Sequence, residues 1–291
     1  YQAEISQGRL EALLNYQTMV IDLTGMELAN ASLLDEGTAA AEAMNMFYGL
    51  DKKSAAHRFF VDNSVFPQTV DILITRAEPI GIEIVRGDYK SFSPDASFFG
   101  ALVQYPNAEG SVEDYREFVS ACKAANVKTC FASDLMALTL LTPPGEFGAD
   151  CVVGNTQRFG VPLGFGGPHA GFMSVRKGLE RSMPGRLVGV SVDVHGNPGM
   201  RLSLATREQH IRREKATSNI CTNSGLCALA FCIHLALLGE DGFTKLAKLN
   251  HAHAVRLAER LSQIGGVKLV TESFFNEFAL RLPRPAAGVV D

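Results

Sequence analysis

The feature that most constrains the fold is an alternation of strand-like and helix-like segments through the middle of the chain. Short apolar runs, rich in β-branched and aromatic residues, alternate with segments of helical periodicity. Strands are expected at 58–61, 81–85, 100–104, 127–132, 150–153, 172–175 and 187–192, and helices at 66–75 and 112–125. This alternation predicts an α/β fold with a mainly parallel sheet and helices on both faces, because parallel neighbours need crossover connections.

The two ends of the chain follow other patterns. At the start we expect an amphipathic helix over 4–23 ended by Gly25, a short strand over 26–31 and an alanine-rich helix over 39–50. At the end we expect helices over 223–238 and 242–264, followed by strands at 267–270 and 277–282. We therefore predict a large domain over 1–238 and the incomplete start of a smaller α+β domain over 239–291.

Composition excludes several classes of protein. A net charge of −4 and a pI near 6.0 argue against nucleic acid as the main partner, since phosphate binding needs a basic face. No uninterrupted apolar run predicts a membrane-spanning helix, and the start lacks the pattern of a signal peptide. The start also lacks a Met and leads almost directly into a helix, which suggests a fragment of a longer, cytoplasmic protein.

The six cysteines and seven histidines do not predict a metal site. The cysteines form no CxxC pair, most lie in apolar runs, and the histidines are scattered. We expect buried free thiols, as is usual in a reducing compartment, at Cys122, Cys130, Cys151, Cys221, Cys227 and Cys232.

The segment over 148–175 has an order of elements that suggests a cofactor site. A strand-like run is followed by a polar turn, a glycine-rich loop and another apolar run. This resembles the lysine segment of pyridoxal-phosphate (PLP) enzymes of the aminotransferase-like fold, where a lysine follows the strand. Here Gln157 and Arg158 occupy that place, and there is no lysine between Lys128 and Lys177. An amide cannot form a Schiff base, so the segment predicts the scaffold without its covalent anchor.

Two further segments could have contacted such a cofactor. Asp35-Glu36-Gly37-Thr38 precedes a helix, where free N–H groups and the helix dipole favour a phosphate. Simple capping by Asp35 or Thr38 explains the same residues, and the two acids would repel a phosphate. Asp134 follows a strand, as does the aspartate that pairs with the pyridinium nitrogen in PLP enzymes; a turn residue at a strand end is the alternative.

Two loops leave their role open. The glycines at 164–167 permit close approach of the backbone to an anion, or form a structural turn. The charged run Arg207–Asn219 is either a solvated surface or a group of arginines that orients an anionic substrate or a partner. Lys215 in this run is an alternative Schiff-base residue, although it follows the glycine loop at a distance that does not match the fold.

Three longer strings carry a closer resemblance. EISQGRLEALLNYQTMVIDLTGMELANASLLDEGTAAAEAM, NTQRFGVPLGFGGPHAGF and REQHIRREKATSNICT resemble the N-terminal half of glycine decarboxylase, the P-protein of the glycine cleavage system. The continuation TNSGLCALAFCIHLALLGE is similar to the bacterial version that is split into two chains, in which this half is subunit 1. The resemblance covers nearly all of the chain, but the family's upstream tyrosine-containing segment is absent.

The resemblance implies a PLP-dependent enzyme that decarboxylates glycine and passes the aminomethyl group to the lipoyl arm of the H-protein. It also implies that PLP is bound covalently by subunit 2, within a heterotetramer, where a lysine stands at the position of Gln157. By similarity to aminotransferase-like dimers, Gly166 and Gly167 would contact PLP held by subunit 2, while Thr38, Asp134 and Gln157 would mark a vestigial site. The alternative is a non-catalytic scaffold or regulatory partner of a PLP enzyme.

Overall fold

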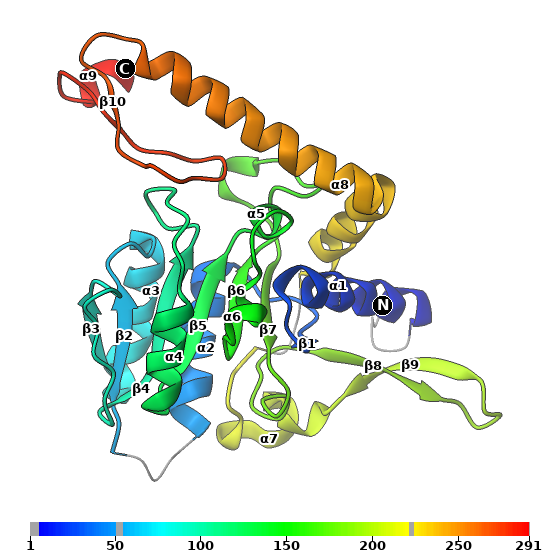
Figure 1. The fold of residues 1–291 in the computed structure, drawn as a ribbon. Coiled ribbons are helices and arrows are strands. Elements are labelled where there is room, and N and C mark those ends of the chain that lie inside the picture. Colours follow the sequence, from blue (N-terminus) through cyan, green and yellow to red (C-terminus); the bar gives the residue numbers. More distant parts are fainter. Residues whose placement is uncertain (1–5, 51–54, 221–223, 291) are drawn as a thin grey trace.

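The central element is a seven-stranded sheet in the order β1-β7-β6-β5-β4-β2-β3 (Figure 1). The structure, a computed structural model, describes residues 6–50, 55–220 and 224–290. The strands of the sheet are β1 Leu28–Ala29, β2 Arg58–Asp62, β3 Glu83–Gly87, β4 Phe98–Tyr105, β5 Lys128–Ser133, β6 Cys151–Asn155 and β7 Gly171–Val175. Strands β2 to β6 pair in parallel, which confirms the predicted sheet, whereas β7 is antiparallel to both of its neighbours.

The helices agree with the predicted periodicity in most places. They are α1 Gln7–Thr24, α2 Glu36–Leu50, α3 Pro67–Ala77, α4 Arg116–Ala124, α5 Leu135–Leu138, α6 Pro144–Phe147, α7 Gln209–Arg212, α8 Gly225–Ser262 and α9 Ala287–Val290, with 3₁₀ turns at Glu78–Ile80, Gly164–Gly166, Ala205–Arg207 and Arg213–Lys215. The predicted start of the first helix at Glu4 lies outside the described residues. Its end is confirmed: Gly25 has φ 66° and its N–H donates to the Ile21 carbonyl.

The helix expected over 112–125 is shorter than predicted. It begins at Arg116, because the N–H of Val112 donates to the carbonyl of Ser273 at 2.9 Å and so belongs to a tertiary contact. The Asp114 carboxylate then accepts from the N–H of Arg116 at 3.1 Å, which favours a helix start at that point.

Helices cover both faces of the sheet, and successive residues of a strand contribute to opposite faces. On β5, Phe131 packs in the cluster with α1, α4 and α8, while Cys130 and Ala132 pack in the cluster with α2 and α3. The sheet is therefore buried on both sides, which explains why its strands read as continuous apolar runs.

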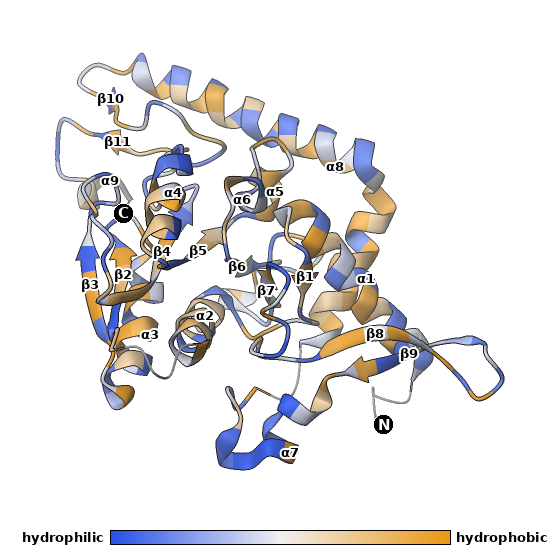
Figure 2. Cartoon of the chain, turned by 60° about the horizontal axis from the view of Figure 1, so that its bottom comes forward, coloured by the Kyte–Doolittle hydropathy of each residue, from blue (hydrophilic) through white to orange (hydrophobic). Residues whose placement is uncertain are grey.

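The strand predicted at 187–192 exists but does not join the sheet. It is β8, Leu187–Val192, and pairs antiparallel with β9, Pro198–Ser203, in a hairpin that extends away from the body (Figure 1). Gln17 of α1 fixes its base, since its side chain donates to the Val188 carbonyl and accepts from the Val188 N–H. Farther out, Val190 and Val192 are exposed. The apolar residues of β8, which Figure 2 colours as hydrophobic, are therefore covered only near α1.

The two helices predicted near the C-terminus form one element with a break. The chain turns at Gly239 (φ 64°, ψ 178°) inside α8, close to where the sequence separates them; the predicted start at Asn223 lies outside the described residues. Within the part of the chain that the structure describes, α8 is the one helix long and apolar enough to cross a membrane, a test that core helices of soluble proteins also pass. Phe243 and Ala247, beyond the predicted domain boundary, pack in the same cluster as α1. The division at residue 238 stays a prediction.

The strands predicted after α8 are very short. They are β10, Lys268–Leu269, and β11, Leu280–Arg281, paired antiparallel. The segment between them contacts the loop that follows β4: the Thr271 hydroxyl donates to the Glu109 carbonyl at 2.7 Å, and Ser111 forms a bridge with Phe274.

The five described cysteines are buried and form no disulfide, as predicted; Cys221 lies outside the described residues. Cys130 and Cys151 face each other in the register of β5 and β6. Burial raises the pKa of the Cys151 thiol well above its usual range.

Candidate functional site at the carboxyl ends of the strands

The carboxyl ends of β4, β5 and β6 meet the start of α2 at one edge of the sheet. In open α/β sheets this is the edge at which ligands bind. Gln104 lies near the end of β4, Asp134 follows β5, Asn155 ends β6 and Glu36 begins α2. Four sequence-distant segments thus bring two carboxylates and two amides together.

Glu36 is the centre of the amide contacts. Its Oε1 accepts from Gln104 Nε2 at 3.2 Å and its Oε2 accepts from Asn155 Nδ2 at 3.4 Å. Burial raises the pKa of the Glu36 carboxyl to about 7, and the negative charges of Asp134 and Asp35 add to the rise. Sequence reasoning treated Glu36 only as a repulsive charge, because its amide partners lie 68 and 119 residues away along the chain.

Asp134 is held on both carboxylate oxygens. Its Oδ1 accepts from the N–H of Met136 at 3.0 Å and caps α5, while its Oδ2 forms an ion pair with the Arg158 guanidinium. Burial raises the pKa of Asp134, and Arg158 opposes this rise. The same guanidinium lies 3.5 Å from Asn250 Oδ1 on α8, so Arg158 connects the end of β5 to that helix.

The side chain of Gln157 forms its hydrogen bond within the glycine loop and not with the carboxylates at the edge of the sheet. Its Nε2 donates to the carbonyl of Leu163 at 3.1 Å, across the base of the glycine turn. Phe165 has φ 54° and Gly166 has φ 107°, and a Cβ on Gly164 or Gly166 would meet nothing within 4 Å. The Phe165 side chain is fully exposed. The tip of the loop is therefore a protrusion that is not covered by the described residues.

The predicted N–H donors of this loop are already used. Gly166 N–H donates to the Leu163 carbonyl at 3.0 Å and Gly167 N–H to the Gly164 carbonyl at 3.3 Å. An external anion would reach these donors only by sharing them or by changing the turn. In the described conformation these glycines, which have no side chain, allow another molecule to come close to their backbone.

At the start of α2 the capping interpretation holds. Asp35 Oδ1 accepts from the N–H of Thr38 at 2.7 Å, so the side chain of Asp35 occupies a donor that a phosphate would need. Thr38 lies at the start of α2 and Asp134 follows β5, whereas Gln157 lies in the loop after β6, and each has a hydrogen-bond partner within the chain.

The alternative Schiff-base residue lies elsewhere. The charged run around α7 is at the end of the sheet opposite to α5, and Figure 2 shows it as a hydrophilic segment. Within this run Arg207 is buried, and its guanidinium donates to the carbonyls of Met183 and Gly185. The structure therefore does not bring Lys215 and Asp134 together.

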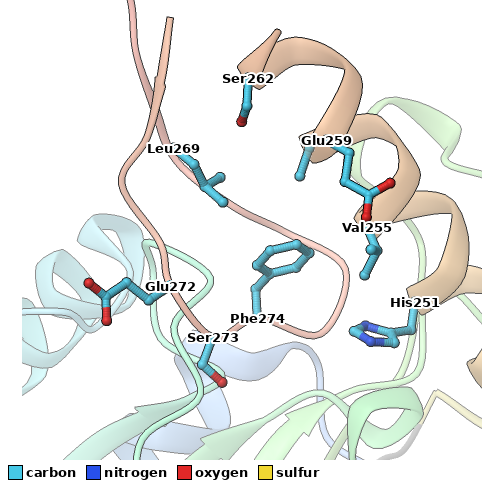
Figure 3. A pocket seen from close by; sticks show the side chains of 9 residues that line it. His251, Val255, Glu259, Ser262, Leu269, Glu272, Ser273 and Phe274 are labelled. Carbon is cyan, nitrogen blue, oxygen red and sulfur yellow. The ribbon is translucent and has the colours of Figure 1, made fainter.

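A groove of about 510 Å³ lies between α8 and the segment that follows β10 (Figure 3). His251 lies beneath it, with Nδ1 2.6 Å from the Phe275 carbonyl. The lining includes Glu259 and Glu272 but no lysine or arginine, so the groove does not suit an anionic cofactor. Among the described residues no cluster of His, Cys, Asp and Glu could hold a metal ion.

The sheet topology and its flanking helices are those of the fold known as type I among PLP-dependent enzymes. A solved structure of a C-DES variant with glycine covalently linked to the PLP cofactor matches 96% of this chain and 74% of its own, at 13% identity and a TM-score of 0.63. More specifically, the chain belongs to the glycine cleavage system P-protein family, whose sequence profile matches residues 1–290.

The relatives in this family are much longer than the chain. The glycine dehydrogenase (decarboxylating) of Nostoc punctiforme is 52% identical over 290 residues, which are 100% of this chain and 29% of that protein. A crystal structure of a glycine decarboxylase P-protein in inhibitor-bound form is 39% identical with a TM-score of 0.93, covering 99% of this chain and 67% of that one. The chain therefore spans less than a third of the length of the curated relatives it matches.

The polar edge of this chain does not fit PLP. Gln157 offers no amine, both oxygens of Asp134 are occupied, and Glu36 fills the space between two amides. A phosphate at the start of α2 would also meet two carboxylates. The signal that could have shown this in the sequence is the arginine next to Gln157, a permanent cation at the position where a lysine is expected.

Proposed function

We propose that the chain is the lysine-free part, subunit 1 or its equivalent, of a glycine dehydrogenase (decarboxylating). In this proposal a second part, subunit 2, binds PLP covalently, glycine is the substrate, and the lipoyl H-protein accepts the aminomethyl group. We further propose a cytoplasmic heterotetramer in which this chain is inactive alone. The family membership supports the reaction, and the length of the relatives supports a second part.

The observation that carries the proposal is the state of the lysine position. By the resemblance, Gln157 occupies the place of the lysine, and in the structure its amide donates to the carbonyl of Leu163 in the glycine loop. Because the chain carries no amine there, we expect covalent chemistry on glycine to be supplied by another part of the enzyme.

The contribution of this chain is then the surface that it presents. The glycine loop protrudes with Leu163 and Phe165 exposed, and its base at Gly160 lies against Ala230 and His234 of α8. Beside it, Leu226, Ile233 and Leu237 are exposed at a spacing of 7 and 4 residues, which places them on one side of α8. We refer to these five apolar residues as the loop–α8 surface.

The loop–α8 surface is uncharged, which favours a permanent partner. No Asp, Glu, Lys or Arg occurs over 159–171 or over 224–239. Obligate interfaces are apolar, whereas transient ones rely more on charge. We propose that subunit 2 covers this surface and that Gly166 and Gly167 lie against its cofactor.

The test is reconstitution with a PLP-bearing subunit 2. We expect no release of CO2 from glycine by this chain, release by the pair, and a turnover about tenfold lower in the pair carrying Gly167→Ala. Gly167 has φ 161°, an extended conformation that alanine adopts, and its Cβ would lie 3.8 Å from His169 Nδ1, so the free chain tolerates the change.

Gly166 needs a control for strain. It has φ 107° and open space, and Gly178 has φ 98° and open space in a distant turn. Gly166→Ala and Gly178→Ala carry the same backbone penalty, so a loss of turnover specific to Gly166→Ala supports contact with the active site. Equal turnover of the two variants, with complex formation intact, contradicts it.

One observation favours the alternative of a non-catalytic scaffold. The N–H groups of Gly166 and Gly167 are satisfied inside the turn, as a purely structural loop requires. The two functions differ in one result: for a scaffold, changes in the loop alter assembly and turnover together, whereas for an active-site surface they alter turnover at constant assembly.

A further inference from the structure

We infer that the Arg158 guanidinium takes the place that the protonated ring nitrogen of PLP has in enzymes of this fold, as the cation paired with an aspartate after the strand. In doing so, Arg158 holds the second segment of α8, the part that follows Gly239, at the edge of the sheet. The inference concerns the free chain, so it does not depend on the identity of the partner. It explains why a fold that elsewhere holds a cofactor at this edge is complete here without one.

The first step is the state of the carboxylates. At this edge Asp134 and Glu36 present four oxygens, and the chain supplies a donor to each of them. The donors are one backbone N–H, one guanidinium and two side-chain amides. An incoming cationic ring nitrogen would therefore have to compete with a donor of the chain at each oxygen, and at Asp134 that donor is a charged guanidinium.

The second step is the choice of the cation. Asp134 is 25% exposed and Arg158 is 33% exposed, so the ion pair is largely withdrawn from water. Removing one partner of such a pair leaves the other charge without compensation at a desolvated position. Arginine stays charged at any physiological pH, so it neutralises Asp134 permanently, whereas a bound cofactor would do so only while present.

The third step is the connection to α8. The Arg158 guanidinium also approaches Asn250, which lies beyond the break at Gly239. The neighbouring Phe159 packs on Phe243 of the same segment, with ring centroids 5.6 Å apart. The two residues that follow Gln157 therefore anchor the second segment of α8, Arg158 through a polar contact and Phe159 by packing.

The test restores the amine and varies the cation. Gln157→Lys and the double variant Gln157→Lys with Arg158→Ala are each incubated with PLP, reduced with borohydride and mapped by mass spectrometry. We expect labelling at position 157 to be at least about tenfold greater in the double variant, because Asp134 is then free to pair with the ring nitrogen. Equal labelling of the two variants, whether high or absent, overturns the inference.

A second measurement covers the case in which the alanine variant does not fold. Arg158→Gln keeps a polar side chain with N–H donors but is shorter and uncharged, and Arg158→Lys keeps a charge. For Arg158→Gln we expect a melting temperature several degrees lower and amide exchange over 244–262 several-fold faster, with a smaller change for Arg158→Lys. Unchanged exchange in this segment with Arg158→Gln contradicts the tie to α8.

The coupling of the two charges provides the control. Asp134→Asn should lower the melting temperature, and combining it with Arg158→Gln should add little further loss, because the pair acts as one unit. Fully additive losses would show that Arg158 stabilises the chain by other contacts, and the inference would then fail.

Discussion

The polar edge of the sheet and the loop–α8 surface are neighbours with opposite character. At the edge, the carboxylate oxygens of Asp134 and Glu36 have partners from the chain itself. By contrast, the side chains of Leu163 and Phe165, in the loop that joins β6 to β7, and of Leu237, on α8, are exposed. The comparison teaches that the carboxylates at the sheet edge are satisfied within the chain, while the part that we propose for a partner is a hydrophobic surface.

The largest effect is expected where the two regions meet. Phe159 is fully buried and packs on Phe231 and Phe243, whereas Phe165, six residues later, is fully exposed. Phe159→Ala should lower the free energy of unfolding by about 3–5 kcal/mol, because it leaves a cavity under α8. Phe165→Ala is the matched control, expected within about 0.5 kcal/mol of the parent chain in denaturant titrations. Similar losses of unfolding free energy for the two variants would show that the buried and the exposed phenylalanine do not differ in their contribution to stability.

A change on the loop–α8 surface should affect association rather than folding. Leu237 is 82% exposed, so Leu237→Asp should change the unfolding free energy by no more than about 0.5 kcal/mol. Binding to subunit 2, followed by calorimetry, should weaken by roughly 2 kcal/mol, or about 30-fold, because a charge would be buried in an apolar interface. Leu249→Asp, at a 54% exposed position beyond Gly239, is the control. Equal weakening by both variants would place the interface elsewhere.

The smallest effect is expected at the polar edge and depends on pH. The pKa of Glu36 is raised from 4.5 to about 7, so the folded chain binds more protons than the unfolded chain between these values. The unfolding free energy should therefore fall as the pH rises from 4.5 to 7, by about 1–3 kcal/mol. Glu36→Gln should remove this dependence and raise the melting temperature at pH 8 relative to the parent chain, with little change near pH 5.

The control for this titration is Glu117→Gln, at an exposed position on α4. It should leave the pH dependence of the parent chain unchanged. If Glu36→Gln keeps the parent slope between pH 5 and pH 7, the carboxyl of Glu36 does not titrate in the proposed range, and the edge is neutralised in another way.

The sequence was sufficient for features that depend on local pattern. Glycine at position 25 ends α1, Gly239 breaks α8, and the apolar runs of β2 to β6 form a parallel sheet as predicted. The resemblance of three strings led to the family, which periodicity alone could not have identified.

Features that depend on distant contacts could not be predicted in this way. Glu36 contacts Asn155 across 119 residues of sequence, and β8 lies outside the large sheet, where Gln17 of α1 contacts Val188. The residues next to Glu36 and Val188 in the sequence do not indicate which distant residue each of them contacts. The role of Arg158 was hidden for the same reason, since its carboxylate lies on another strand and its amide contact on α8.

The buried thiols allow the local opening of this fold to be measured by chemical labelling. Cys130 and Cys151 lie on neighbouring central strands, while Cys227 and Cys232 lie on the inner side of α8. A thiol reagent reaches a buried cysteine only when its surroundings open, so each labelling rate measures the free energy of opening at one place. The order in which the cysteines react would therefore show whether α8 lifts from the sheet before the strands separate, without any residue being changed.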